Sequence, residues 1–155
     1  MFEGPLRQAI HHLKYNGRAC LAEPLGSLIV ERWEKAALPA DLIVPVPLHP
    51  ARLRERGYNQ STLLAHQLAQ ACGLPVVEDA LRRVKATLPQ ITLNAEQRKV
   101  NVQDAFEAQA DLVQGRRVLL IDDVCTTGAT LAACSHALKQ AGATSVWALT
   151  LGRAP

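Results

Sequence analysis

Two adjacent carboxylates, Asp122 and Asp123, stand directly after the most apolar run of the chain, Val118 to Ile121. A hydroxyl-rich turn with one glycine follows them and leads into a helical pattern that begins near Ala129. An apolar run of this length predicts a buried strand, and α/β sheets bind their ligands beyond the carboxyl ends of such strands. We therefore expect the two carboxylates and the turn to belong to one binding site.

The turn has the composition of a site for a single phosphate group. Backbone N–H groups at the start of a helix and Thr hydroxyls donate hydrogen bonds to phosphate oxygens, and the helix dipole adds positive potential. Gly128 permits close approach of the ligand. The carboxylates repel a polyphosphate but accept hydrogen bonds from the vicinal hydroxyls of a sugar. The residues of this predicted ribose 5-phosphate cradle are Asp122, Asp123, Val124, Cys125, Thr126, Thr127, Gly128, Ala129 and Thr130.

The residues of this segment also allow other interpretations. The sequence contains neither G-x-x-x-x-G-K-[ST] nor G-x-G-x-x-G, the patterns of P-loops and dinucleotide sites. Asp123 or Thr126 could simply cap the following helix, which requires only one residue of the set. Cys125 has no His near it in the sequence, so we interpret it as a small spacer rather than a nucleophile.

The apolar periodicity of the whole chain predicts an α/β fold with a parallel central sheet flanked by helices. Residues 85–104 lack an apolar period, except for a possible short helix capped by Asn94. The length of 155 residues suits one domain, with a helical N-terminal region over 1–38 and a core over 39–155. The expected helices lie near 5–15, 21–33, 64–72 and 131–141, and the expected strands at 42–46, 75–77, 118–121 and 145–151.

The net charge of +3 is distributed unevenly along the chain. Residues 49–60 carry a local +2 and residues 82–99 a local +4, while the remainder is negative. This concentration of positive charge indicates an anionic ligand. The four cysteines fit neither a zinc site nor a disulfide framework, and no export signal or membrane span is visible, so we expect a reduced cytoplasmic protein.

The segment from Val118 to Thr130 resembles the phosphoribosyl pyrophosphate (PRPP) binding motif of the type I phosphoribosyltransferases. The likeness extends from about residue 6 to residue 151 and is to the ComF family of competence-associated proteins, which includes the GntX-like proteins. Members of that family usually begin with a cysteine-rich zinc-binding segment, which this sequence lacks, so we expect either a natural short form or a chain without that module. The motifs that carry the likeness are Pro45-Val-Pro-Leu48, Arg52, Arg56-Gly57-Tyr58-Asn59-Gln60, Leu81-x-Arg83, Thr87-x-x-Gln90-x-x-Leu93, Arg98-x-x-Asn101 and Ala105-Phe106.

The resemblance implies a type I phosphoribosyltransferase fold that transfers a 5-phosphoribosyl group from PRPP and releases pyrophosphate. It implies that Asp122 and Asp123 hold the ribose hydroxyls and that a mobile loop over residues 85–104 closes over the site, with Lys85 and Arg98 neutralising the leaving pyrophosphate. Mg²⁺ is then expected as cofactor, held mainly by PRPP rather than by a protein metal site. The segment implied to receive the pyrophosphate contains Pro45, Val46, Pro47, Arg52 and Arg56.

Two alternatives remain open from the sequence. The protein could bind single-stranded DNA through its basic segments, although its few aromatic residues supply a stacking platform poorly. It could also sense PRPP without catalysis, because a sensor and an enzyme need the same cradle residues. Arg52, Arg56, Lys85 and Arg98 could each instead be a solvated surface residue, and Tyr58 could be a packing residue.

Overall fold

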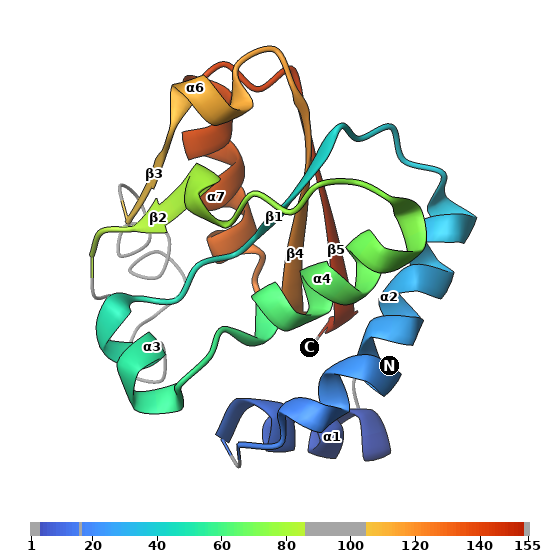
Figure 1. Cartoon of the computed structure of the whole chain (residues 1–155). Helices are drawn as coiled ribbons and strands as arrows, with labels where there is room; N and C mark the ends of the chain where they lie inside the picture. Colours follow the sequence, from blue (N-terminus) through green and yellow to red (C-terminus); the bar gives the residue numbers. More distant parts are fainter. Residues whose placement is uncertain (1–3, 16, 86–104, 154–155) are drawn as a thin grey trace.

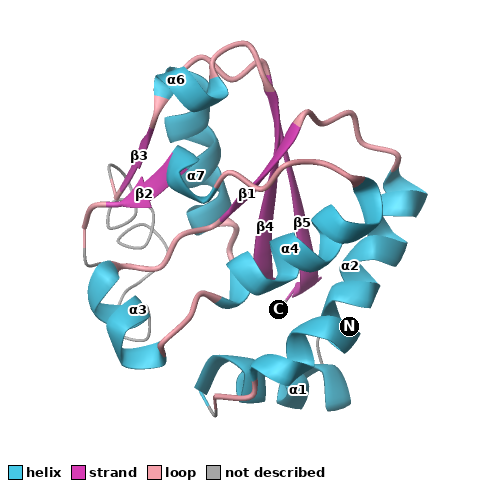
Figure 2. Cartoon of the chain, viewed as in Figure 1, coloured by secondary structure: helices cyan, strands magenta, loops and turns pink. Residues whose placement is uncertain are grey.

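A computed structural model describes residues 4–15, 17–85 and 105–153. Its centre is a parallel sheet of three strands in the order β1-β4-β5, formed by β1 (Leu42–Pro45), β4 (Arg117–Cys125) and β5 (Ser145–Arg153). In the register of this sheet Leu42 pairs with Val118, and Val118 pairs with Val146. The predicted α/β fold with a parallel sheet is therefore confirmed, and helices flank it as expected (Figures 1 and 2).

Three helices pack on one face of the sheet: α1 (Pro5–Tyr15), α2 (Ala22–Ala36) and α4 (Gln60–Cys72). A short 3₁₀ turn, η1 (Ala19–Leu21), separates the first two. Alternate strand residues face these helices, because side chains along a strand point to opposite faces; Ile43, Leu119 and Ile121 are fully buried among them. Gly26 lets α2 approach α4, since a Cβ at this position would lie 2.4 Å from Cβ of Gln67.

The opposite face of the sheet is covered by α7 (Ala129–Gln140) and an antiparallel hairpin, β2 (Leu81–Arg83) and β3 (Phe106–Ala108). The 3₁₀ turn η2 (Glu78–Ala80) precedes β2, and the short α6 (Ala110–Val113) follows β3. Val44, Val118 and Leu120 are fully buried on this side. Because both faces are covered, β1 and the first part of β4 have the continuous apolar sequences from which the sheet was predicted.

The chain differs from the sequence prediction at three places. Residues 75–77 form only an isolated bridge between Val76 and Ile43, rather than a strand. The hairpin of β2 and β3 was not predicted, because each strand has only three residues and no alternation can be recognised over that length. The helix α3 (Pro50–Arg56) was predicted as part of a loop, because it is polar and buries none of its residues.

Two further expectations concern residues 85–104 and the absence of a membrane-spanning helix. The short helix expected after Asn94 and the loop over 85–104 fall almost entirely outside the described residues, which on this side end at Lys85 and resume at Ala105. In the part of the chain that the structure describes, no helix combines the length and apolar character needed to cross a membrane.

Candidate functional site

The site lies in and just after the carboxyl-terminal half of β4, where Asp122 and Asp123 form what we call the acidic pair; β4 extends to Cys125, four residues beyond the predicted end at Ile121. Asp123 is 2% exposed, and its Oδ1 lies 2.9 Å from Nζ of Lys14 in α1. Its other oxygen, Oδ2, is buried and has no hydrogen-bond partner among the described residues. A buried carboxylate oxygen without a donor is costly, so this atom marks a place where a ligand can donate a hydrogen bond.

Asp122 is held by donors from two elements. Its Oδ1 accepts hydrogen bonds from the Ser61 hydroxyl of α4, at 3.0 Å, and from the backbone N–H of Asp123, at 2.8 Å. Burial, together with the neighbouring charge of Asp123, raises the pKa of the Asp122 carboxyl to about 7, against the lowering effects of the Asp123 N–H, Lys14 and Ser61. One oxygen of each carboxylate is thus fixed by the protein.

The phosphate turn, residues 126–130, follows the acidic pair after two intervening residues. Val124 and Cys125 are the last residues of β4, Thr126 and Thr127 are exposed, and α7 begins at Ala129. Gly128 precedes α7 with a φ of +79°, a conformation that glycine adopts without strain. The Thr127 Oγ1 accepts from the Ala129 N–H at 3.3 Å, and the next amides of the first turn have no intrahelical acceptor. This geometry suits one bound anion.

The segment after β1 offers fewer backbone donors than the sequence suggested. Pro45, Pro47 and Pro50 have no N–H, and the Val46 N–H already donates to the carbonyl of Ile121 at 2.9 Å. The Val46 carbonyl accepts from Nδ2 of Asn59 at 3.0 Å, which ties this segment to the start of α4. Between residues 45 and 50, only Leu48 and His49 retain N–H groups for a ligand.

Arg52 and Arg56 lie on α3, which begins with the imidazole of His49 as its cap, since Nδ1 accepts from the Ala51 N–H at 3.3 Å. In Figure 1, α3 and α1 both lie at the end of the sheet toward which β4 and β5 run. Arg52 and Arg56 line a cavity of about 360 Å³ together with residues from the end of α1, namely Lys14, Tyr15 and Gly17, and with Glu55. The Arg56 side chain also donates to Gln60. This cavity is positively charged.

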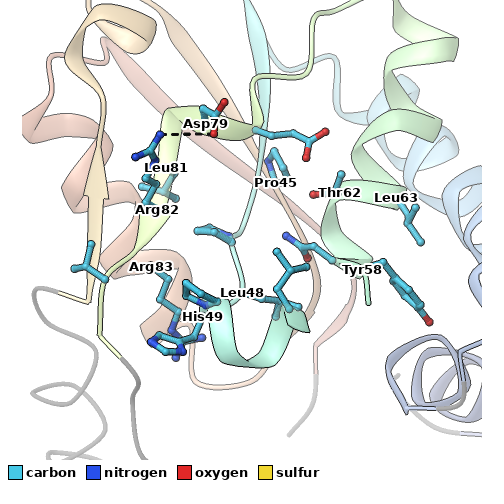
Figure 3. Close-up of a pocket in the computed structure, with 16 residues that line it drawn as sticks. Pro45, Leu48, His49, Tyr58, Thr62, Leu63, Asp79, Leu81, Arg82 and Arg83 are labelled. Atoms are coloured by element: carbon cyan, nitrogen blue, oxygen red, sulfur yellow. Dashed lines mark ion pairs between the residues drawn. The ribbon is translucent and has the colours of Figure 1, made fainter. Parts of the chain in front are cut away.

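A larger cavity of about 720 Å³ lies on the other side of α3 (Figure 3). Its walls come from the segment after β1, the start of α4 and the strand β2, and they include Leu48, His49, Leu81 and Arg83. The side chains of His49 and Arg83 lie close together at one end of this view, and the Arg82–Asp79 ion pair lies at the other. Neither carboxylate of the acidic pair lines this cavity, so it adjoins the site without containing it.

Two cations reach the site that the sequence had not assigned to it. Lys14 contacts Asp123, 109 positions away in the sequence, and no local signal in α1 distinguishes it from a surface lysine. Arg83 appeared only as part of a motif; its guanidinium lies over the Phe106 ring, 5.5 Å from the ring centre. Burial lowers the pKa of Arg83, nearby Arg52 lowers it as well, and Asp122 raises it, which shows that Arg83 lies within electrostatic range of both. Tyr58 donates its hydroxyl to the carbonyl of Leu13.

The two remaining predicted residues have different positions. Lys85 is exposed and follows β2 closely, at the last described position before residue 105. Arg98 lies outside the described residues, so the structure does not place it. Among the residues that are described, no group of three or more His, Cys, Asp or Glu side chains could hold a metal ion.

Comparisons with known proteins agree on the class of fold. The phosphoribosyl transferase domain family matches residues 55–155. A glutamine PRPP amidotransferase from B. subtilis, solved with ADP and GMP, has a similar structure with a TM-score of 0.60 over 84% of this chain and 26% of its own, at 23% identity. The fold is that of the type I phosphoribosyltransferases.

Two curated relatives identify the family to which the chain belongs within this class of fold. DNA utilization protein YhgH from Escherichia coli K12 is 38% identical over 153 residues, which span 94% of this chain and 66% of that protein. Competence protein F from Haemophilus influenzae is 34% identical over 158 residues, which span 97% of this chain and 69% of that protein. The chain thus spans about two-thirds of the length of these relatives, and it belongs to the ComF family of proteins with a phosphoribosyl transferase domain.

Proposed function

We propose that this protein binds PRPP and transfers its 5-phosphoribosyl group to a nucleophile, with release of pyrophosphate. The observation that carries the proposal is the buried Oδ2 of Asp123, which has no hydrogen-bond partner among the described residues and lies beside Asp122, with the phosphate turn beginning two residues later in the chain. Each carboxylate of the acidic pair has one oxygen fixed by protein donors and one available, which matches the two hydroxyls of a ribose. The turn then accepts the 5-phosphate.

The reaction needs positioning and charge rather than an enzyme nucleophile. The bond from ribose C1 to the pyrophosphate oxygen breaks, and its electron pair leaves with pyrophosphate. The lone pair of the acceptor forms the new bond to C1, and the acceptor's proton passes to solvent or to a base. By analogy with glycosyl transfer, positive charge develops on the sugar ring in the transition state. The acidic pair lies beside that ring in the proposed complex and stabilises this charge as it forms.

Three cations, two on α3 and β2 and one just after β2, are the candidates for contact with the leaving group. Arg52 on α3 and Arg83 on β2 lie within electrostatic range of one another, and Lys85 follows two residues after Arg83. We assign Arg52 and Arg83 to the pyrophosphate, together with the N–H groups of Leu48 and His49. Arg56 is already engaged with Gln60 and Tyr15, so we assign it to the wall of the smaller cavity. Mg²⁺ would enter with the pyrophosphate and neutralise part of its charge, held by substrate oxygens and water.

Calorimetric titration with PRPP and Mg²⁺ tests this assignment. Replacing both acidic residues, Asp122→Asn with Asp123→Asn, is expected to weaken PRPP binding about 100-fold, because two charged acceptors become neutral amides. Asp79→Asn removes one exposed carboxylate from η2 and serves as the control, with affinity unchanged within about twofold. A double variant that is folded and binds PRPP as tightly as the parent would overturn the proposal.

Catalysis is tested separately from binding. Lys85→Ala and Arg98→Ala are expected to reduce pyrophosphate release far more than PRPP affinity, because their contacts strengthen as charge develops on the leaving group. Equal losses in turnover and affinity would assign these residues to ground-state binding. PRPP binding without any pyrophosphate release or exchange would favour a sensor over an enzyme.

Single-stranded DNA is a second candidate ligand, and one surface favours it. The Tyr15 ring is 59% exposed, with the guanidinium of Arg56 5.3 Å from its centre and the His11 ring 4.9 Å away. Exposed aromatic rings beside cations are the elements of a base-stacking site. The names of the relatives, DNA utilization protein and competence protein, agree with such a ligand. Tyr15→Ala should then lower the affinity for labelled oligo(dT) far more than the affinity for PRPP; unchanged oligo(dT) affinity would remove this candidate.

A further inference from the structure

Three consecutive residues at the end of α1 each contact a different part of the site. The carbonyl of Leu13 accepts the Tyr58 hydroxyl from the segment before α4. Lys14 pairs with Asp123 at the end of β4, and the Tyr15 ring lies against Arg56 of α3. The end of α1 is therefore fixed on three sides, and Lys14 is held in place by its neighbours as well as by its own ion pair.

The ion pair determines which atoms of the acidic pair remain available. The side chain of Asp123 is 3% exposed and that of Lys14 is 24% exposed, so this pair is largely withdrawn from water. A buried carboxylate requires such a partner to stay ionised. Lys14 occupies Oδ1 of Asp123 and leaves Oδ2, while Ser61 and the Asp123 N–H occupy Oδ1 of Asp122. Each carboxylate thereby retains one acceptor atom.

We propose that Lys14 is a positioning residue that makes the acidic pair selective for a vicinal diol. It forms a largely buried ion pair with Asp123 and fixes its Oδ1, so that the ligand encounters one acceptor oxygen from each carboxylate. It also offsets one of the two negative charges, which lowers the repulsion of a phosphorylated ligand. This inference rests on the proposed function, because it assumes that a ribose 5-phosphate group is the ligand of the cradle.

Without Lys14 the pair would behave differently. Two adjacent, buried carboxylates disfavour joint ionisation, and a proton taken up by the pair converts an acceptor into a donor. The charged or titratable groups around the pair are Lys14 from α1, Arg83 from β2 and Cys134 from α7, with the Ser61 hydroxyl from α4. The charge of Lys14 lowers the pKa of Asp122. Loss of Lys14 should therefore raise this pKa, so that Asp122 ionises at a higher pH.

The test compares ribose 5-phosphate with 2-deoxyribose 5-phosphate by calorimetry between pH 6.5 and 8.5. Both ligands have the same phosphate, so the ratio of their affinities isolates recognition of the diol. We expect the parent to prefer ribose 5-phosphate by about tenfold, and Lys14→Met to abolish most of that preference at pH 7 and to regain part of it at higher pH. Lys14→Arg should retain the preference. Lys35→Met, in the exposed pair with Glu31, is the matched control and should match the parent.

A double-mutant cycle shows whether Lys14 acts through Asp123. In an Asp123→Asn background, which carries no buried charge at this position, Lys14→Met should leave the affinity ratio unchanged. This background also keeps the test valid if Lys14→Met alone does not fold. A parent-like ratio and pH profile in Lys14→Met, or an equal loss in both backgrounds, would contradict the inference. Failure of the parent to bind either sugar phosphate would instead contradict the proposed function.

Discussion

The substitution Asp122→Asn should stabilise the folded protein at alkaline pH. Asn has the shape of Asp, and its Oδ1 can accept the same hydrogen bonds from the Ser61 hydroxyl and the Asp123 N–H. The substitution removes a carboxylate that is next to Asp123 and whose pKa burial raises from 3.8 to about 7. A site built for ligand binding is often destabilising in this way when no ligand is present.

The size and sign of the effect follow from linkage. Below pH 4 the Asp122 carboxyl is protonated in the folded and the unfolded chain, so it contributes no cost. Between pH 4 and pH 7 the unfolded chain loses this proton first, and the folded state becomes progressively less stable. Above pH 7 both states are ionised and the folded state carries the whole cost. A pKa shift of about three units corresponds to a gain in the free energy of unfolding of at most about 4 kcal/mol. We take about 2 kcal/mol as the lower end of this gain, because the neutral Asn accepts the two hydrogen bonds less strongly than a carboxylate does.

Urea denaturation of both proteins between pH 4.5 and 8.5 measures this effect. The free energy of unfolding of Asp122→Asn should exceed that of the parent by about 1 kcal/mol at pH 4.5 and by about 2 to 4 kcal/mol at pH 8.5. All other titrating groups are common to both proteins and largely cancel in the difference. Asp79→Asn controls for the loss of one exposed negative charge and should give a curve parallel to that of the parent. Parallel curves for Asp122→Asn, or a variant less stable than the parent at pH 8.5, would refute the reasoning.

Three other expectations concern single contacts. Gly128→Ala should lower the free energy of unfolding by about 1 to 2 kcal/mol, because the φ of +79° disfavours an L residue. The added Cβ itself has room, since the nearest atom, Sγ of Cys125, is 3.9 Å from it. Gly73→Ala, at a φ of +72°, should lower the free energy of unfolding by as much in urea denaturation but leave phosphate binding unchanged. Tyr58→Phe should lower stability by about 1 kcal/mol, since the Leu13 carbonyl loses its donor; an unchanged melting temperature would argue against that bond. Arg117 lowers the pKa of Asp41 to about 2, so Asp41→Asn should be less stable than the parent at neutral pH, and the difference should vanish as the pH falls through 2.

The sheet and its principal helices were predictable because their apolar patterns are long. Residues 118–121 and the stripe over 64–72 bury whole faces, and Asn59 and Gly73 mark both ends of α4. The hairpin and α3 were not predictable for the opposite reason: three-residue strands and a polar helix contain no period that distinguishes them from loops.

The candidate site was predictable only where its residues are contiguous. The acidic pair and the phosphate turn stand together within nine positions, so their types and order define the chemistry. Lys14, Ser61 and Arg83 reach the same place from three other elements, and only tertiary packing brings them there. The count of aromatic residues also did not reveal that one exposed ring lies beside Arg56, which only the tertiary structure places there.

A crystal structure of the protein with PRPP and Mg²⁺ tests the central claim most directly. The account predicts that the 5-phosphate accepts hydrogen bonds from residues 126–130 and that the ribose hydroxyls donate to Oδ2 of Asp122 and of Asp123. It also predicts that the Lys14–Asp123 ion pair persists in the complex. PRPP bound elsewhere, with the phosphate turn and the acidic pair left without ligand contacts, would contradict the account.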